Sequence, residues 1–379
     1  MSKLKGNFIS GLFLFLFTIV LCLLSAFQFI SMHKKEAIYP SKWLSTKKML
    51  SSYFPELKDT PGDTEVFLYQ GQEEGGNILI LGGTHPNEPA GFVTAVLLIE
   101  NIRVTRGKLI IIPRANNSGF THNDPQEGNP QRFFLETSGG RREFRYGSRL
   151  TNPVHQWPDP ALYINPAGQK ISGIETRNLN RCFPGKNKGY LTEKIAFGIM
   201  ELIKKEKIDL GIDLHEAAPE YPVINAIVFH DNSAELAALS QMELQLEGFE
   251  FRLEASPPNL RGLSHREWGD EAHIQAVLLE TANASHGRLK GKPSPSLIVD
   301  GKDKNYTKAA RLGLLFVPYG EEGIPLKQRV ARHLASISAL LASLNELDPK
   351  KRIEIDNVPS PLQVQENGIG FFLTPLKRS

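Results

Sequence analysis

The chain has 379 residues, of which 41% are hydrophobic and 22% charged, and its formal net charge is +3. These values are typical of a folded globular protein and exclude a chain that is disordered over most of its length. The small net charge and the lack of a long basic run predict no nucleic-acid partner. Because Cys22 and Cys182 lie far apart, we expect neither a disulfide framework nor a cysteine-based zinc site.

Residues 1–35 are predicted to form a membrane segment. An uncharged run extends from Gly6 to Met32, with two lysines on each side of it. It exceeds the ~20 apolar residues that a bilayer-spanning helix needs and the ~7–15 of a cleaved signal peptide. We therefore expect a membrane anchor, with the main body outside the cytoplasm, in the periplasm. The alternative is a cleaved signal sequence and an exported soluble protein. The flanking lysines leave the orientation open.

The rest of the sequence divides into a connector at 36–63, a main domain at 64–345 and a short extension at 346–379 that adds a strand or two to a sheet edge. In the main domain, short apolar strands alternate with amphipathic helices. This alternation predicts an α/β fold, a sheet covered by helices on both faces. The expected strands are 64–69, 77–81, 108–112, 208–214, 225–229 and 276–279, and the expected helices are 88–102, 190–207, 233–246 and 325–344.

The stretch between Pro113 and Gly189 differs from the rest of the domain. It is rich in Asn, Pro, Gly and Arg and has little periodicity, and so long a loop in a compact domain is usually functional. Its arginine-rich part predicts either a pocket for an acidic substrate or a solvated charged loop. The arginines concerned are Arg141, Arg142, Arg145 and Arg149.

A metal site is predicted where the strand at 77–81 ends. The following segment, GGTHPNEPAG at 82–91, contains His85 and Glu88 just before a helix begins. Ligands of open α/β sheets collect at the carboxyl ends of strands. His215 in KIDLGIDLHE follows another strand and supplies a third ligand. Two histidines and one glutamate leave a coordination position open, which is the pattern of a catalytic zinc site.

Three motifs in this order carry a family resemblance: GGTHPNEPAG, NLNRCFPG and DLHE. Together they resemble the zinc carboxypeptidase superfamily, and within it the succinylglutamate desuccinylase/aspartoacylase branch. The sequence departs from that branch at Pro86, where Gly is usual, and at Asn178, where Asp is usual. The resemblance implies a zinc-carboxypeptidase-like mixed sheet with helices on both faces, here behind an N-terminal transmembrane helix, and one Zn²⁺ per chain.

The resemblance also implies roles for individual residues. His85, Glu88 and His215 would hold zinc, and Asn180 and Arg181 would hold a substrate carboxylate. Arginine suits that task because its planar fork pairs both carboxylate oxygens. Glu280 in AVLLETAN would be the general base, and Arg114 in IIPRANNSG would polarise the scissile carbonyl. Glu216 is expected to point away from the metal, because neighbouring strand residues face opposite sides. His122 and His265 are placed near the mouth of the site.

The function implied is zinc-dependent hydrolysis of an amide, an N-acyl amino acid or a peptide, on a small substrate that bears a carboxylate. A zinc-bound water would be the nucleophile and Glu280 its base. The first alternative is an anchored metallocarboxypeptidase that acts on peptidoglycan or peptides. The second is of another class: a non-catalytic, membrane-anchored binding module on the same fold.

Overall fold

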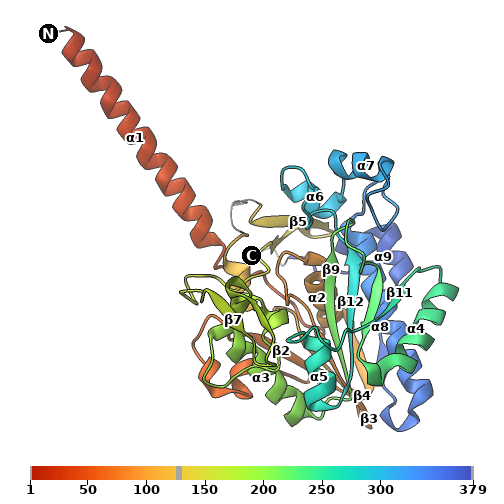
Figure 1. The fold of residues 1–379 in the computed structure, drawn as a ribbon. Helices are drawn as coiled ribbons and strands as arrows, with labels where there is room; N and C mark the ends of the chain where they lie inside the picture. The colour runs from red at the N-terminus through yellow and green to blue at the C-terminus, as the bar shows by residue number, and fades with distance from the viewer. Residues whose placement is uncertain (1, 125–129, 377–379) are drawn as a thin grey trace. The chain divides into compact units, whose positions relative to one another are not determined.

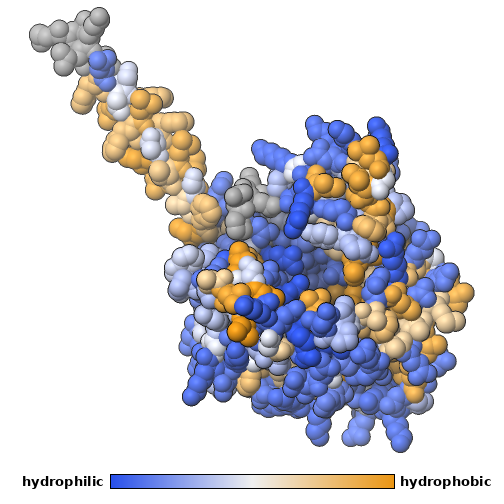
Figure 2. All heavy atoms as spheres, viewed as in Figure 1, coloured by the Kyte–Doolittle hydropathy of each residue, from blue (hydrophilic) through white to orange (hydrophobic). Residues whose placement is uncertain are grey.

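The computed structural model describes residues 2–124 and 130–376. The chain divides into two compact units, with the boundary between Glu36 and Ala37. The first unit contains α1 (Ser2–Ser31). Within the described residues, this is the one helix long and apolar enough to cross a membrane, over Asn7–Ser31, and Figure 2 shows apolar side chains along it. A membrane anchor and a signal sequence both fit this observation.

The second unit is built on one mixed sheet (Figure 1). Nine strands among the described residues join it in the order β1-β2-β4-β3-β9-β12-β10-β11, with β13 also paired to β4. The strands β4, β3, β9 and β12 run parallel to their neighbours in this central part. The strand bounds are β1 (Thr46–Met49), β2 (Glu65–Gln70), β3 (Glu73–Leu81), β4 (Arg103–Ile112), β9 (Leu210–Ala217), β10 (Ala226–Phe229), β11 (Arg252–Ala255), β12 (Gln275–Ala282) and β13 (Glu354–Asp356).

Helices cover both faces of this sheet (Figure 1). One apolar core lies between the sheet and α2, α4 and α8, and a second lies between the sheet and α3 and α5. β3 contributes side chains to both cores, because alternate residues of a strand face opposite sides of the sheet. Ile78 and Ile80 belong to the first core, and Leu79 and Leu81 belong to the second. The helix bounds are α2 (Pro89–Asn101), α3 (Leu191–Glu206), α4 (Ala234–Leu246), α5 (Ser264–Ala272), α6 (Pro295–Asp300), α7 (Lys304–Arg311), α8 (Leu326–Leu347) and α9 (Pro361–Asn367).

The predicted α/β fold is confirmed, and each predicted strand and helix has a counterpart within a few residues of the expected bounds. Several short elements were not predicted. The connector contains β1, an edge strand whose sequence TKKM carries no apolar alternation. The long stretch after Pro113 contains two hairpins, β5 (Arg132–Thr137) with β6 (Gly140–Arg145) and β7 (Leu162–Ile164) with β8 (Lys170–Ser172). The C-terminal extension adds β13 to the sheet, as expected, although to β4 rather than to an outermost strand.

Candidate active site and metal centre

The site lies at the carboxyl ends of β3, β9 and β12. β3 ends at Leu81, and the chain then turns through Gly83, whose φ is +65°. A Cβ at Gly83 would come within 2.8 Å of the carbonyl oxygen of Pro113, so glycine is required there. At Gly91 a Cβ would come within 2.5 Å of the Leu214 carbonyl oxygen, so this glycine lets α2 pack closely on β9. Both glycines fix the short segment that carries His85 and Glu88.

Glu88 lies between the two predicted histidine ligands. Its Oε1 is 2.8 Å from His85 Nδ1, and its Oε2 is 3.0 Å from His215 Nδ1. The Glu216 backbone N–H donates to the same Oε2 at 3.0 Å. All three side chains are buried, so one carboxylate and two Nδ1 atoms converge on one small volume.

The far nitrogens of both histidine rings face oxygen atoms. His85 Nε2 is 2.8 Å from Asn178 Oδ1, and His215 Nε2 is 3.0 Å from Asp213 Oδ2, although without the angle of a hydrogen bond. Asp213 in turn accepts hydrogen bonds from Thr84 Oγ1 at 2.8 Å and from Ser264 Oγ at 2.5 Å. Metal-binding histidines are usually oriented by such oxygens, which fix the tautomer that leaves Nδ1 free for the metal.

These contacts shift the pKa values of the cluster. Burial alone would raise the pKa of Glu88, but His85 and His215 outweigh it and hold this pKa well below its usual range. Burial lowers the pKa of His85. For His215, burial would lower the pKa, but Asp213 and Glu88 raise it well above the ordinary value. Glu88 is therefore held as a buried carboxylate, and together with Asp213 it favours positive charge at the position of His215.

The cluster fits a metal ion. The ligand atoms of His85, Glu88 and His215 all lie within 4.8 Å of one another. Imidazole nitrogen and carboxylate oxygen are the donors that zinc takes in catalytic sites with three protein ligands. The structure thus brings the three predicted metal ligands together.

Glu280 stands beside the metal cluster. It lies on β12 directly opposite His215 of β9, in a parallel pair of strands. It lines the same cavity, and its Oε2 has no hydrogen-bond partner among the described residues. Burial raises the pKa of Glu280 to about 8, although His215 opposes this shift. A carboxylate with a raised pKa and a free oxygen is suited to accept and return a proton.

Asn180 and Arg181 line the cavity from the other side. Asn180 Oδ1 accepts a hydrogen bond from the Ser264 backbone N–H at 2.9 Å, which fixes it to the start of α5. One guanidinium nitrogen of Arg181 donates to the Asn180 carbonyl oxygen at 2.6 Å. Burial lowers the pKa of Arg181, which favours an anionic partner in the cavity. Both predicted residues therefore line the same cavity as His85, Glu88 and His215.

Arg114 lies elsewhere. It is 1% exposed, its guanidinium pairs with Glu65 at the start of β2, and it does not line the cavity. Arg114 follows β4. In the sheet, β4 lies between β2 and β3, so it is not adjacent to β9, the strand that carries His215. This position gives no support to a role of Arg114 in polarising the substrate carbonyl, which stays a prediction from the sequence.

Arg149 occupies the cavity instead. Its charge influences the pKa values of His85, Arg181 and Glu280, which places it near all three. From the sequence, Arg149 is expected only as one of four arginines in the long loop. The bridge between Leu150 and Asn178 brings this part of the loop to the segment that carries Asn180 and Arg181. No local sequence signal indicates that pairing.

The other arginines of that loop have structural partners. Arg142 is buried and forms an ion pair with Glu100, and Arg145 stacks over the Phe120 ring at 5.2 Å. Arg141 stacks over Phe134 at 3.6 Å. Of the four, Arg149 alone is among the described residues that line the cavity. The four together therefore do not form an acidic-substrate pocket.

Three further predictions concerned residues near the site. Glu216 points away from the metal cluster, as expected: its Oε2 accepts from the Ala90 backbone N–H at 2.8 Å, and its Oε1 pairs with Arg329 at 2.6 Å. His265 lines the cavity, whereas His122 lies outside it with Nε2 at 2.7 Å from the Leu150 carbonyl oxygen. His286 was not predicted, yet it lines the cavity, and its Nε2 is 3.6 Å from Glu88 Oε1.

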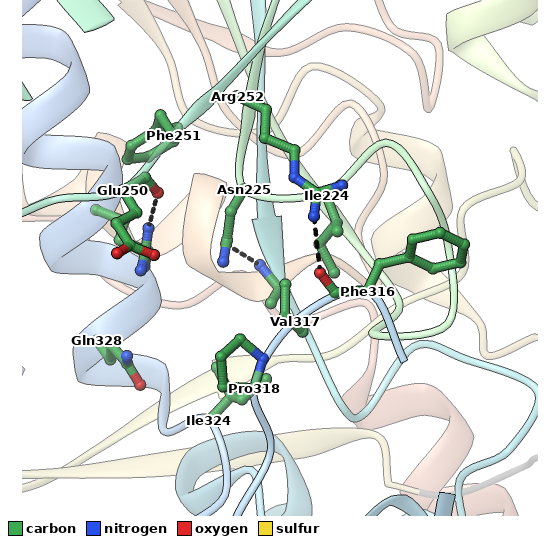
Figure 3. Close-up of a pocket in the computed structure, with 12 residues that line it drawn as sticks. Ile224, Asn225, Glu250, Phe251, Arg252, Phe316, Val317, Pro318, Ile324 and Gln328 are labelled. Atoms are coloured by element: carbon green, nitrogen blue, oxygen red, sulfur yellow. Dashed lines mark hydrogen bonds between the residues drawn. The ribbon is translucent and has the colours of Figure 1, made fainter. Parts of the chain in front are cut away.

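The cavity itself measures about 260 Å³, so it suits a small molecule or a chain end. A second cavity of about 260 Å³ lies at the side of the sheet near β11 (Figure 3). Its arginines are engaged by backbone carbonyl groups: Arg252 donates to Phe316 at 3.1 Å, and Arg332 to Glu250 at 2.8 Å. None of the predicted site residues is among the described residues that line it.

No family model matches the sequence, and no curated protein matches it. Solved structures do match. The cell shape determinant protein Csd4 from Helicobacter pylori has a TM-score of 0.46 and 15% identity, over 80% of this chain and 59% of that one. A metallo-carboxypeptidase from Burkholderia cenocepacia has a TM-score of 0.43 and 12% identity, over 79% and 69%. An aspartoacylase family protein from Mesorhizobium loti has a TM-score of 0.35 and 19% identity, over 58% and 56%.

This chain therefore spans about 59% of the length of the first of these structures. What these proteins act on is a property of those proteins, and the function of this chain is argued below from its own residues.

Proposed function

We propose that this chain is a zinc-dependent hydrolase that cleaves an amide in a small substrate with a free carboxylate, and that it holds one zinc per chain. The observation that carries the proposal is the convergence of His85 Nδ1, His215 Nδ1 and the Glu88 carboxylate beside Glu280. A structural metal site would need no general base such as Glu280. A binding module would need no metal cluster beside such a base.

The bound metal would supply a Lewis acid and would lower the pKa of water. Glu280 lines the cavity with an oxygen that has no partner within the part of the chain that the structure describes, so it accepts the proton of the attacking water. The same carboxyl then returns a proton to the leaving amine. Arg149 places a fixed positive charge in the cavity, which stabilises negative charge that develops on the carbonyl oxygen.

Asn180 and Arg181 position the substrate. Arginine pairs a carboxylate through two parallel hydrogen bonds, and Asn180 adds an amide donor beside it. Asn180 is held at the start of α5 through Ser264, so the carboxylate site is rigid before substrate arrives. Such preorganisation lowers the entropy cost of bringing the amide to the base. The substrate is therefore an N-acyl amino acid or the carboxyl end of a peptide.

A metallocarboxypeptidase that acts on peptides or peptidoglycan would use the same residues, and substrate profiling separates it from a deacylase. The non-catalytic binding module is disfavoured because Glu280 keeps an unpartnered oxygen beside the metal cluster, which a mere binding site does not need. We further propose that α1 anchors the second unit to a membrane, with that unit in the periplasm. Its 25-residue apolar stretch supports a span, and an exported soluble form is the alternative.

The proposal is tested by metal analysis of the full chain purified in detergent. Wild-type protein should contain about one zinc per chain and hydrolyse at least one amide from a panel of N-acyl amino acids and short peptides. His215→Ala should lose the metal and the activity, whereas His273→Asn, at an exposed histidine on the end of α5, should keep both. A folded, zinc-supplemented wild type that binds no metal contradicts the proposal.

A further inference from the structure

The cavity at the proposed active site has two chemically different ends. One end holds the metal cluster, Glu280 and the two arginines described above. The other end is lined by apolar side chains from two strands and two loops. These include Val228, Leu260, Leu263 and Leu278. A substrate that fills the cavity therefore meets charge at one end and hydrocarbon at the other.

Sheet register builds the apolar floor. On β12, Leu278 precedes Glu280 by two residues, so both side chains face the same side of the sheet. The antiparallel neighbour β10 places Val228 opposite Leu278 and Ala226 opposite Glu280. Ala226, Val228 and Leu278 form a small apolar cluster separate from the two large cores. The sheet surface next to Glu280 is therefore apolar, and two of its residues, Val228 and Leu278, line the cavity.

The apolar wall is attached directly to the carboxylate site. Leu263 precedes Ser264, whose backbone N–H holds Asn180 Oδ1 at 2.9 Å. The Phe183 backbone N–H donates to the Gly262 carbonyl oxygen at 3.2 Å, and Asn165 Nδ2 donates to the Arg261 carbonyl oxygen at 3.1 Å. These bonds fix the loop that contains Leu260 and Leu263 next to Arg181. The side chain of the substrate residue whose carboxylate binds there is therefore the group that meets this wall.

The charges in the cavity argue against an acidic side chain at that position. Arg149 and Arg181 are the fixed cations among the described residues that line the cavity, and the proposed reaction uses both. His265 also lines the cavity, is 2% exposed and has neither ring nitrogen hydrogen-bonded among the described residues, so it offers one hydrogen bond to a polar group of the substrate. A second carboxylate against Val228 and Leu278 would lose its hydration without a fixed cation in exchange.

We propose that the residue with the free carboxylate carries a large apolar side chain, of the leucine or phenylalanine class, and that this side chain occupies the apolar end of the cavity. The inference rests on the proposed function, since it names the substrate class of the same site. Burial of such a side chain is favourable at about 25 cal/mol per Å² of apolar surface.

Binding and turnover test the inference separately. Zinc-loaded full chain with Glu280→Gln is titrated calorimetrically with N-acetyl-L-leucine, N-acetyl-L-phenylalanine, N-acetyl-L-aspartate and N-acetyl-L-glutamate. The apolar ligands should bind about ten-fold or more tightly than the acidic ones, a ratio typical of a matched apolar pocket. Equal or reversed affinities overturn the inference. Zinc-loaded wild type is assayed in parallel on these amides and on the corresponding acetyl-alanyl dipeptides.

A substitution in the wall sharpens the test. Leu260→Arg, at a partly exposed loop position, should remove the apolar preference and raise the relative affinity for the acidic ligands by about ten-fold. The matched control Leu246→Arg, at a side chain 90% exposed on α4, should leave the preference unchanged. An unaltered preference in Leu260→Arg contradicts the assigned pocket.

The two failures are distinguishable. Hydrolysis of acidic amides in preference to apolar ones overturns the substrate class and leaves the zinc hydrolase standing. If wild type hydrolyses nothing, the proposed function fails, while the ligand affinities of the Glu280→Gln protein still decide whether the pocket selects apolar side chains.

Discussion

Two buried charge clusters lie at opposite ends of α2, and they differ in how their charges are balanced. At its C-terminal end, Glu100 pairs with both guanidinium nitrogens of Arg142, at 2.7 and 2.9 Å, and accepts from the backbone N–H groups of Tyr39 and Thr374. At its N-terminal end, Glu88 meets two histidines whose charge depends on pH. In the first cluster, protein atoms neutralise the carboxylate and make its hydrogen bonds. In the second cluster, the carboxylate and the two imidazole rings have the ligand atoms and the negative charge to bind a cation.

The difference shows how a structural cluster and a functional one are told apart. Arg142 also donates to the carbonyl oxygens of Ala37 and Thr374, so the Glu100 cluster joins the two ends of the second unit. A buried ion pair whose hydrogen bonds are all made leaves nothing for a ligand, and the fold depends on it because removal of one partner leaves the other charge buried and unpaired. Unpartnered atoms at Glu280 and His265, next to the Glu88 cluster, indicate a site that is completed by metal and substrate.

The largest expected effect is on catalysis. Glu280→Gln removes the base and should lower kcat by about 10²- to 10⁴-fold while one zinc per chain remains bound. Steady-state kinetics and elemental analysis on the same preparation measure both quantities. Glu271→Gln, at an exposed residue of α5, is the control and should retain full activity. Full activity in the Glu280→Gln protein would remove Glu280 from the mechanism.

A substitution in the Glu100–Arg142 cluster should instead lower the stability of the fold. Arg142→Met leaves the Glu100 carboxylate buried without its cation and should lower the free energy of unfolding by about 3–5 kcal/mol. Folded protein should nevertheless keep its zinc. Chemical denaturation measures the loss, and Arg141→Met at the neighbouring exposed position should cost far less. Loss of zinc with unchanged stability would show that the two clusters have been assigned the wrong way round.

A smaller effect is expected where the protein orients a metal ligand. Asn178 Oδ1 holds His85 Nε2 at 2.8 Å, and loss of such a partner lowers metal affinity by about 10- to 100-fold. Asn178→Leu should show this drop in competition with a chelator of known zinc affinity. Asn178→Asp, which keeps an acceptor oxygen, should restore most of the affinity. Equal affinities in all three proteins would exclude an orienting role.

The smallest expected effect is on the stability of the fold at low pH, and it concerns a third charged residue, Glu206, whose side chain is 10% exposed. Burial would raise the pKa of Glu206, but hydrogen bonds from Tyr53, Lys108 and Lys48 outweigh it and lower this pKa to about 2. Its contribution to stability is therefore present above the unfolded-state pKa of about 4.3 and is lost as pH falls toward 2. The stability difference between wild type and Glu206→Gln should shrink between pH 6 and pH 3. A constant difference would exclude this ionisation as the cause.

The sequence predicted that His85, His215 and Glu280 would lie close together, because each lies at or just after the end of a strongly apolar strand, whereas the role of Glu280 as a base was implied by the family resemblance alone. Strand ends are readable from local pattern, and β3, β9 and β12 bring His85, His215 and Glu280 to one edge. Arg114 also follows such a strand, but the order of strands across the sheet is not readable from local pattern, and β4 proved to end beside β2.

The position of Arg149 in the cavity could not be predicted for a related reason. It lies in a loop without periodicity, and the contact of Leu150 with Asn178 joins residues far apart in the sequence. Short elements such as α5 were missed because a helix of nine residues that begins SHREW shows no clear apolar stripe. The position of Leu263 in the cavity wall, directly before α5, could not be predicted without that helix, whereas His265 was expected near the site.

The Glu100–Arg142 pair also has a mechanical consequence. The chain enters the second unit at Ala37, and the Ala37 carbonyl oxygen is held by Arg142 at 2.8 Å. The first residue of the second unit is therefore fixed to a buried ion pair at the C-terminal end of α2, the helix whose other end carries Glu88. A force applied to the chain at Ala37 would act first on this pair.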